Sequence, residues 1–348
     1  MHAYAVQDSS GMLKMDAMEN PHRLPPDLQA QLGRRLGAVA LNRYPAACIG
    51  NLRDALAADA QVPAGFDIML GNGSDELISL LAMACDVPGA GILAPVPGFV
   101  MYGLSAQLQG LKFVGVALDA DFELDESVML AAIEEHQPSI IYLAYPNNPS
   151  ANLWNDAVIE KIIGAAPGLV VMDEAYQPFA SRSFITRIAH YEHVLLMRTM
   201  SKFGLAGVRI GYLVGRKALI AEIDKVRPPY NISVLNAECG VFALENDHVF
   251  AAQARDIVAQ RTLLMAALER LPGVHAYKSD ANMILVRILS AARADAGVAD
   301  AVFERMKERK VLVKNVSGMH PLLANCLRLT VGTADDNAAM LLALRESL

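Results

Sequence analysis

Three residues in the middle of the chain could act together on a small ligand. Lys202 lies between an apolar run and a glycine-rich segment, where loss of water would lower its pKa and make the amine nucleophilic. Asp173 ends another apolar run, so its carboxylate should be partly buried and in need of a cationic partner. Tyr176 follows and could direct its hydroxyl to the same side. A surface lysine and a solvated acid are the ordinary alternatives, so the chemistry depends on where these residues meet.

Groups that could bind an anion accompany these residues. Gly71-Asn-Gly-Ser-Asp-Glu is a glycine turn that leads into a predicted helix, whose free N–H groups and dipole would attract a phosphate. Taken alone, a plain N-cap at Ser74 is the simpler interpretation. Two prolines in Tyr145-Pro-Asn-Asn-Pro-Ser favour an extended turn that presents Asn147 and Asn148. Thr199, Ser201 and Arg209, which flank Lys202, are further candidate phosphate ligands.

The predicted elements place these segments at one edge of a sheet. Several short runs are apolar throughout, as in strands covered on both faces. Strands are predicted at residues 66–70, 91–94, 112–116, 139–144, 169–172, 194–198 and 210–214. Helical segments at 74–84 and 125–135 alternate with them, which predicts an α/β fold with a mostly parallel seven-stranded sheet. Ligands bind at the carboxyl ends of such strands, and a lysine, an acid, a phenol, amides and an anion site are the groups that pyridoxal phosphate requires.

The pattern changes after about residue 235, where strands and helices mix without a repeating crossover. Here we predict helices at 249–270, at 298–309 and from Thr333 onward, and strands at 283–287, 311–314 and 327–331. The chain should therefore divide into an arm over 1–36 that packs on the small domain, a large cofactor-binding domain over 37–240 and a small α+β domain over 241–348.

Composition limits the classes of function. The 348 residues suffice for two domains, and 30 Lys and Arg against 37 Asp and Glu give a net charge of −7, which argues against a nucleic-acid binder. Residues 87–111 are uncharged, but repeated prolines and glycines indicate a buried strand, turn and helix instead of a membrane span. The N-terminus shows no secretory leader and the four cysteines form no CxxC pair, so we expect a cytoplasmic protein with reduced thiols and no metal.

Taken together, the motifs resemble those of the fold-type I pyridoxal-phosphate-dependent aminotransferases, and among them the branch that acts on histidinol phosphate. The similar segments extend over nearly the whole chain: Glu19-Asn-Pro, Asn42-Arg-Tyr-Pro, Gly71-Asn-Gly-Ser-Asp-Glu, Pro146-Asn-Asn-Pro, Asp173-Glu-Ala-Tyr, Thr199-Met-Ser-Lys and Leu327-Arg-Leu-Thr-Val-Gly-Thr. The resemblance implies bound pyridoxal 5'-phosphate. It also implies a reversible transamination in histidine biosynthesis, between histidinol phosphate with 2-oxoglutarate and imidazole-acetol phosphate with glutamate.

The resemblance implies a role for each matching residue. Lys202 would form a Schiff base with the cofactor and later move a proton, and Asp173 would pair with the ring nitrogen. Asn148 and Tyr176 would bind the phenolic oxygen, and Phe99 would stack on the ring. The phosphate ligands would be Gly73, Ser74, Asp75, Thr199, Ser201, Arg209 and, from the partner subunit of a homodimer, Tyr44. The substrate ligands would be Tyr4, Asn20, Lys314 and Arg328.

Two further enzyme functions stay open at this point. An aminotransferase for aromatic or other amino acids would use the same cofactor residues, and so would a lyase that acts on a phosphorylated amino acid. A non-catalytic regulator with the same fold is disfavoured, because Lys202 is present and the net charge is acidic.

Overall fold

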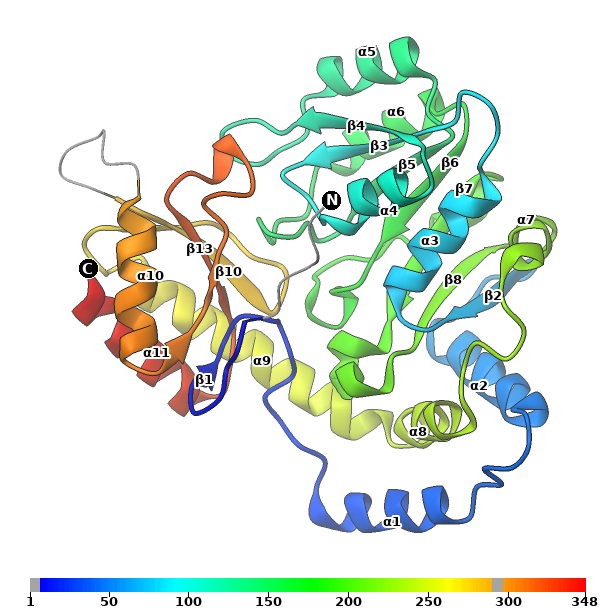
Figure 1. The fold of residues 1–348 in the computed structure, drawn as a ribbon, viewed down its shortest axis with the longest axis horizontal. Coiled ribbons are helices and arrows are strands. Elements are labelled where there is room, and N and C mark those ends of the chain that lie inside the picture. Colours follow the sequence, from blue (N-terminus) through cyan, green and yellow to red (C-terminus); the bar gives the residue numbers. More distant parts are fainter. Residues whose placement is uncertain (1–6, 290–296) are drawn as a thin grey trace.

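The structure is a computed structural model that describes residues 7–289 and 297–348, and its centre is a seven-stranded sheet (Figure 1). The strand order is β2-β8-β7-β6-β5-β3-β4. β8 runs antiparallel to both of its neighbours, and the other pairings are parallel. The strands are β2 (Phe66–Gly71), β3 (Gly91–Val96), β4 (Lys112–Ala117), β5 (Ile140–Ala144), β6 (Leu169–Asp173), β7 (Val194–Thr199) and β8 (Gly211–Arg216). The predicted α/β fold with a mostly parallel seven-stranded sheet is confirmed.

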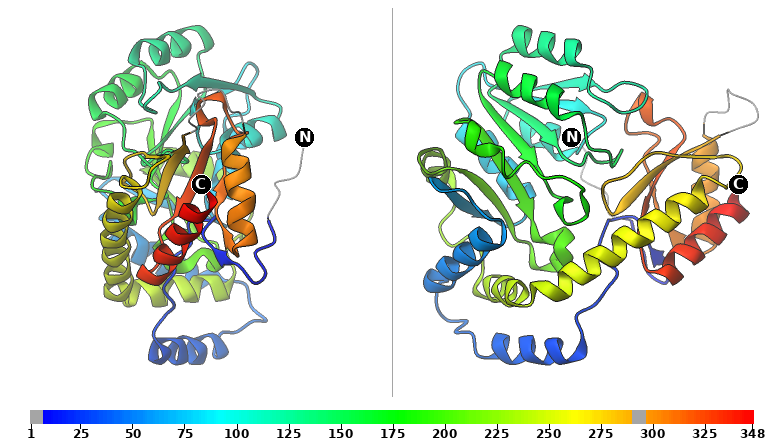
Figure 2. Two further views of the ribbon diagram at one scale, coloured as in Figure 1. Left: turned by 90° about the vertical axis from the view of Figure 1, so that its left-hand side faces the viewer. Right: turned by 180° about the vertical axis from the view of Figure 1, so that it is seen from behind.

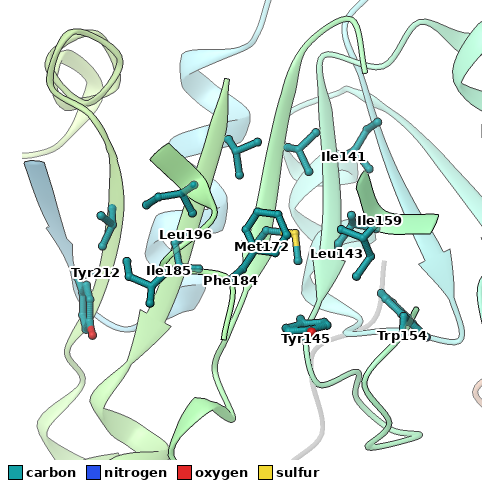
Figure 3. Close-up of a cluster of buried hydrophobic side chains, with 14 of the residues drawn as sticks. Ile141, Leu143, Tyr145, Trp154, Ile159, Met172, Phe184, Ile185, Leu196 and Tyr212 are labelled. Atoms are coloured by element: carbon teal, nitrogen blue, oxygen red, sulfur yellow. The ribbon is translucent and has the colours of Figure 1, made fainter. Parts of the chain in front are cut away.

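The inner strands β5, β6 and β7 are buried on both faces, which is why they are mostly apolar, whereas the edge strand β4 is largely exposed. In β5, Ile141 and Leu143 belong to one buried cluster, drawn in Figure 3, whereas Ile140 and Tyr142 belong to the cluster on the other face. The first cluster includes side chains of α2 (Ala46–Asp59), α5 (Glu126–His136), α6 (Asp156–Ala165) and α8 (Val234–Glu245). The second includes side chains of α3 (Ser74–Ala84), α4 (Met101–Leu108) and α7 (Lys217–Ile223).

A separate four-stranded antiparallel sheet, in the order β12-β13-β10-β9, forms the second part of the molecule and has its own buried cluster. Helix α9 (Asp247–Leu268) runs from α8 to this sheet, as Figures 1 and 2 show. The other elements are β9 (Val274–Ala276), β10 (Met283–Ile288), α10 (Val298–Glu308), β11 (Val311–Leu312), β12 (Lys314–Asn315), β13 (Cys326–Thr330) and α11 (Ala334–Ser347). The three-part division of the chain stays a prediction.

The N-terminal segment contacts both parts. Its strand β1 (Leu13–Lys14) pairs in parallel with β11. It then forms a helix, α1 (Pro26–Gly37), which the sequence did not predict and which contacts α8. Pro26 is tolerated in the first turn because its missing N–H has no partner there in any helix, and Leu28 is the helix's one buried residue. Leu28, Leu32 and Leu36 recur at helical spacing and lie on the buried or half-buried side, so the sequence does carry a pattern that could have indicated α1.

The uncharged stretch 87–111 forms β3, a turn and α4, so the predicted buried strand, turn and helix are confirmed. Across residues 7–289 and 297–348, none of the helices combines the length and the apolar character needed to cross a membrane.

Candidate active site

A cavity of about 370 Å³ lies at the carboxyl ends of β5, β6 and β7, whose last residues Ala144, Asp173 and Thr199 line it. This is the edge at which a parallel sheet binds ligands. The cavity brings together most of the residues that the sequence singles out, from segments far apart in the chain. They are Ser74, Asp75, Phe99, Asn148, Asp173, Tyr176, Thr199, Ser201, Lys202 and Arg209.

Lys202 enters the cavity from a short π-helical turn, η3 (Ser201–Leu205), directly after β7. The turn is interrupted at Gly204, where φ is 135° and a Cβ would lie 2.9 Å from the Phe250 side chain, so glycine is required there. The Lys202 ammonium donates to the carbonyl of Ala17 (3.1 Å). Burial, and then the nearby guanidinium of Arg328, lower the pKa of Lys202 to about 8. The amine is therefore partly neutral near pH 7.

Asp173 lies at the end of β6 and is only 4% exposed. The Tyr102 hydroxyl donates to its Oδ2 (2.6 Å), and the Ala175 N–H donates to its Oδ1 (3.0 Å). Burial raises the pKa of Asp173 to about 6, although both hydrogen bonds act in the opposite direction. A carboxylate with this environment would gain stability from a cationic partner inside the cavity.

The start of α3 supplies anion-binding groups. Its N-cap is Gly73 (φ 79°), no side chain caps the helix, and Ser74 is the first helical residue, so the plain N-cap interpretation of Ser74 is wrong. A Cβ at Gly73 would lie 2.6 Å from a guanidinium nitrogen of Arg209, which forms an ion pair with Asp75 (3.0 Å). The open N–H groups, the helix dipole and Arg209 thus converge at one end of the cavity. The Ser201 N–H donates to Thr199 Oγ1 (3.1 Å), and the Thr199 hydroxyl donates to Ser201 Oγ (3.0 Å), so the two hydroxyls are held together in the cavity lining.

The residues of the cavity fit pyridoxal phosphate. Lys202 offers an amine for an aldehyde, and Asp173 offers a carboxylate for a protonated ring nitrogen. The start of α3 with Arg209 offers N–H donors and a cation for a phosphate. Phe99 lines the same cavity and so is placed to contact a ring.

The predicted substrate residues occupy several positions. Arg328 is buried and donates to Asn148 Oδ1 and to the Asp16 carbonyl (both 2.7 Å), so it reaches the cavity through Asn148. Lys314 is the cross-strand partner of Arg328 in the β12–β13 ladder, which puts both side chains on the same face of the sheet. Asn20 does not line the cavity. Its side chain donates to Gln253 (3.0 Å).

Two other predicted residues lie away from this cavity. Tyr44 is 76% exposed, does not line the cavity of its own chain, and stacks on Tyr230 with ring centroids 4.5 Å apart. Tyr4 lies outside the described residues.

Two polar residues of the cavity lining, Glu19 and Tyr102, have no role predicted from the sequence. Glu19 is part of a motif that the sequence singles out, and its carboxylate is paired with Lys14 (2.6 Å). Tyr102 lies three residues after Phe99, a spacing that puts both on one side as the chain enters α4. That spacing could have indicated a second aromatic residue at the site, but the bond from its hydroxyl to Asp173 depends on the tertiary fold.

Comparisons with known proteins agree with this geometry. The family model for aminotransferase class I and II matches residues 12–344. The histidinol-phosphate aminotransferases of Polaromonas naphthalenivorans and Methylibium petroleiphilum are 71% and 64% identical, each over 100% of this chain and over 94% and 92% of their own lengths. The enzyme of that name from Sinorhizobium meliloti, solved in complex with pyridoxal-5'-phosphate, is 24% identical with a TM-score of 0.85, covering 96% of this chain and 90% of that one, and it shows the shared fold. The chain therefore belongs to the class I and II aminotransferases, and within them to the histidinol-phosphate aminotransferase family.

Proposed function

We propose that this protein transfers the amino group of histidinol phosphate to 2-oxoglutarate, giving imidazole-acetol phosphate and glutamate, and catalyses the reverse reaction. One observation supports transamination: Lys202 and Asp173 line the same cavity as the uncapped N-terminus of α3. The choice of substrate is supported by the 71% identity to a relative named for it.

Pyridoxal phosphate, when bound, supplies an electron-withdrawing ring that makes the substrate Cα–H bond acidic. Lys202 has two tasks beside it. Its neutral amine would hold the aldehyde group of the cofactor. The same Nζ would accept the proton that leaves the substrate Cα and hold it for the return transfer. A pKa lowered to about 8 suits a group that must be both base and acid near neutral pH.

The remaining residues orient the cofactor. Asp173 would hold the ring nitrogen in its protonated form, and this pairing would in turn keep the buried carboxylate ionised. Arg328 donates to the amide oxygen of Asn148, so the amide NH₂ of Asn148 is the group left to donate to a phenolic oxygen, beside Tyr176. Both side chains are thereby directed at the same part of the ligand.

Arg328 and Lys314 supply positive charge for the substrate phosphate. They are cross-strand neighbours on one face of the small sheet, and Arg328 is already fixed by its bonds to Asn148 and to Asp16. A guanidinium and an ammonium together suit a dianionic phosphate better than the single carboxylate of an ordinary amino acid.

A panel of half-reactions tests the proposal. The protein with bound cofactor is mixed separately with histidinol phosphate, phenylalanine and threonine phosphate, and the cofactor absorbance is followed by stopped flow. We expect histidinol phosphate to react at least tenfold faster than the other two. Faster reaction with phenylalanine would replace the proposal by an aromatic aminotransferase, and release of CO₂ from threonine phosphate would replace it by a lyase. Lys202→Ala serves as the control and should react with none of the three.

We also propose that the protein is a cytoplasmic homodimer in which Tyr44 reaches the cofactor phosphate of the partner subunit. The support is the exposed position of Tyr44, which stacks on Tyr230; Leu41, three residues earlier in the chain, is exposed as well. A solvent-exposed aromatic pair of this kind is typical of surfaces that bind another protein.

A further inference from the structure

Among the described residues, Tyr102 is the one whose side chain donates a hydrogen bond to Asp173. Its hydroxyl lies 2.6 Å from Asp173 Oδ2, and the other oxygen, Oδ1, accepts from the Ala175 N–H. Each carboxylate oxygen is thus held by one donor from the protein, and each retains a lone pair for a ligand in the cavity. The carboxylate plane is fixed before any ligand arrives.

The Tyr102 ring cannot easily move away from this bond. It is buried, it stacks on Tyr142 with centroids 4.3 Å apart and an interplanar angle of 6°, and it meets Phe99 edge-on at 5.6 Å. The stack places two tyrosines side by side in the same buried cluster, yet only one of their hydroxyls reaches Asp173. The Tyr142 hydroxyl is buried and has no hydrogen-bond partner among the described residues.

The other groups that face Asp173 would not keep it ionised. Asp75 at the start of α3 and the adjacent Glu174 raise its pKa, as does burial. Tyr142 and Tyr176 contribute phenols and no positive charge, and burial raises the pKa of Tyr142 well above its ordinary value. Within this set only the hydroxyl of Tyr102 and the N–H of Ala175 favour the charged carboxylate.

We propose that Tyr102 is a positioning residue that holds Asp173 ionised and aimed into the cavity, so that this carboxylate can keep the ring nitrogen of the cofactor protonated. The inference deepens the proposed function and rests on it only for the step that involves the cofactor. The hydrogen bond itself belongs to the protein alone, so it can be tested without any ligand.

The first test is a ¹³C NMR titration of cofactor-free protein labelled at aspartate carboxyl carbons, with Asp173→Asn used to assign the signal. In the wild type we expect a midpoint near 6. Tyr102→Phe keeps the ring and the stack and removes only the donor, so the midpoint should rise by about one pH unit, the effect of losing one hydrogen bond to a charged group. Tyr142→Phe removes a hydroxyl from the same stack and should leave the midpoint unchanged.

The second test uses the protein with its cofactor. In Tyr102→Phe the absorbance of the Lys202-bound cofactor should persist, whereas the acid limb of the kcat profile should move up by about one pH unit and activity at pH 6 should fall about fivefold. Tyr142→Phe should match the wild type. An unmoved NMR midpoint in Tyr102→Phe would overturn the inference. A moved midpoint in a protein without transaminase activity would instead refute the proposed function and leave the role of Tyr102 intact.

Discussion

At the scale of single residues, burial shifts the two central groups of the cavity in opposite directions. It raises the pKa of Asp173 and lowers that of Lys202, so in both cases the neutral form is favoured. Without a ligand the site therefore holds groups whose charged forms cost free energy. A bound cofactor would remove both costs, since it pairs with the acid and uses the neutral amine. The cofactor-free protein should consequently be less stable than the protein with bound cofactor.

This leads to a prediction for Asp173→Asn in the cofactor-free protein. The folded-state pKa of about 6 lies above the ordinary value of 3.8, so the folded state binds more protons between these two pH values. Stability is therefore lost as the pH rises from about 4 to about 6, by an amount on the order of 3 kcal/mol. The amide carries no charge, so Asp173→Asn should unfold at higher urea concentration than the wild type at pH 7, while its transaminase activity is lost.

Urea denaturation at pH 4.5 and pH 7, at one fixed protein concentration, measures this difference. The advantage of Asp173→Asn should shrink toward pH 4.5, and Asp54→Asn at an exposed position of α2 should show no such trend. If Asp173→Asn is less stable than the wild type at pH 7, the buried Asp173 carboxylate does not destabilise the cofactor-free fold.

Asp173 could be predicted from the sequence because it ends a continuous apolar run, and Lys202 because it lies between an apolar run and a glycine-rich segment. Tyr102 could not. A tyrosine inside an uncharged segment has the same sequence context whether its hydroxyl reaches a carboxylate, as in Tyr102, or ends without a partner, as in Tyr142. Only the tertiary fold, which stacks Tyr102 on Tyr142 and brings its hydroxyl to Asp173, distinguishes the two.

At the scale of elements, the start of α3 shows how backbone geometry makes a binding site. Gly73 adopts a positive φ that L side chains rarely adopt, and its missing Cβ leaves the space that the Arg209 guanidinium occupies. The strands and α3 itself could be predicted, because buried parallel strands and glycine turns leave strong local patterns. The division of the predicted strand 311–314 into β11 and β12 leaves no such pattern, because tertiary contacts decide it.

Gly73→Ala should weaken cofactor binding more than it weakens the fold. The added Cβ would displace Arg209 and strain the residue that opens the helix, so the dissociation constant for pyridoxal phosphate should rise at least about tenfold. Fluorescence titration of the cofactor-free protein measures it. Gly164→Ala on α6 is the matched control, because a Cβ there has no neighbouring atom within 4 Å, and it should bind the cofactor as the wild type does. Equal affinities for all three proteins would exclude an anion site at the start of α3.

At the scale of the whole molecule, the described chain supplies every part of the cofactor site that the sequence singles out except Tyr44. That residue is exposed and stacked on Tyr230 at a different surface. A residue with this position can contribute to a site only by entering the cavity of another copy. The symmetric arrangement of two copies would then complete two sites at once, each with Lys202 from one subunit and Tyr44 from the other.

Mixing two inactive or weakened variants tests this arrangement. Tyr44→Phe should lose the cofactor faster on dilution, and Lys202→Ala should not bind it covalently. If the sites are shared, a dimer of one subunit of each kind contains one site with both residues intact, because Lys202 comes from the Tyr44→Phe subunit and Tyr44 from the Lys202→Ala subunit. After unfolding and refolding together in equal amounts, about a quarter of all sites should regain wild-type cofactor retention.

Sedimentation measures the dimer, and absorbance after dilution measures retention. No regained sites in a confirmed mixed dimer, or full retention by a Tyr44→Phe monomer, would show that each chain builds its site alone.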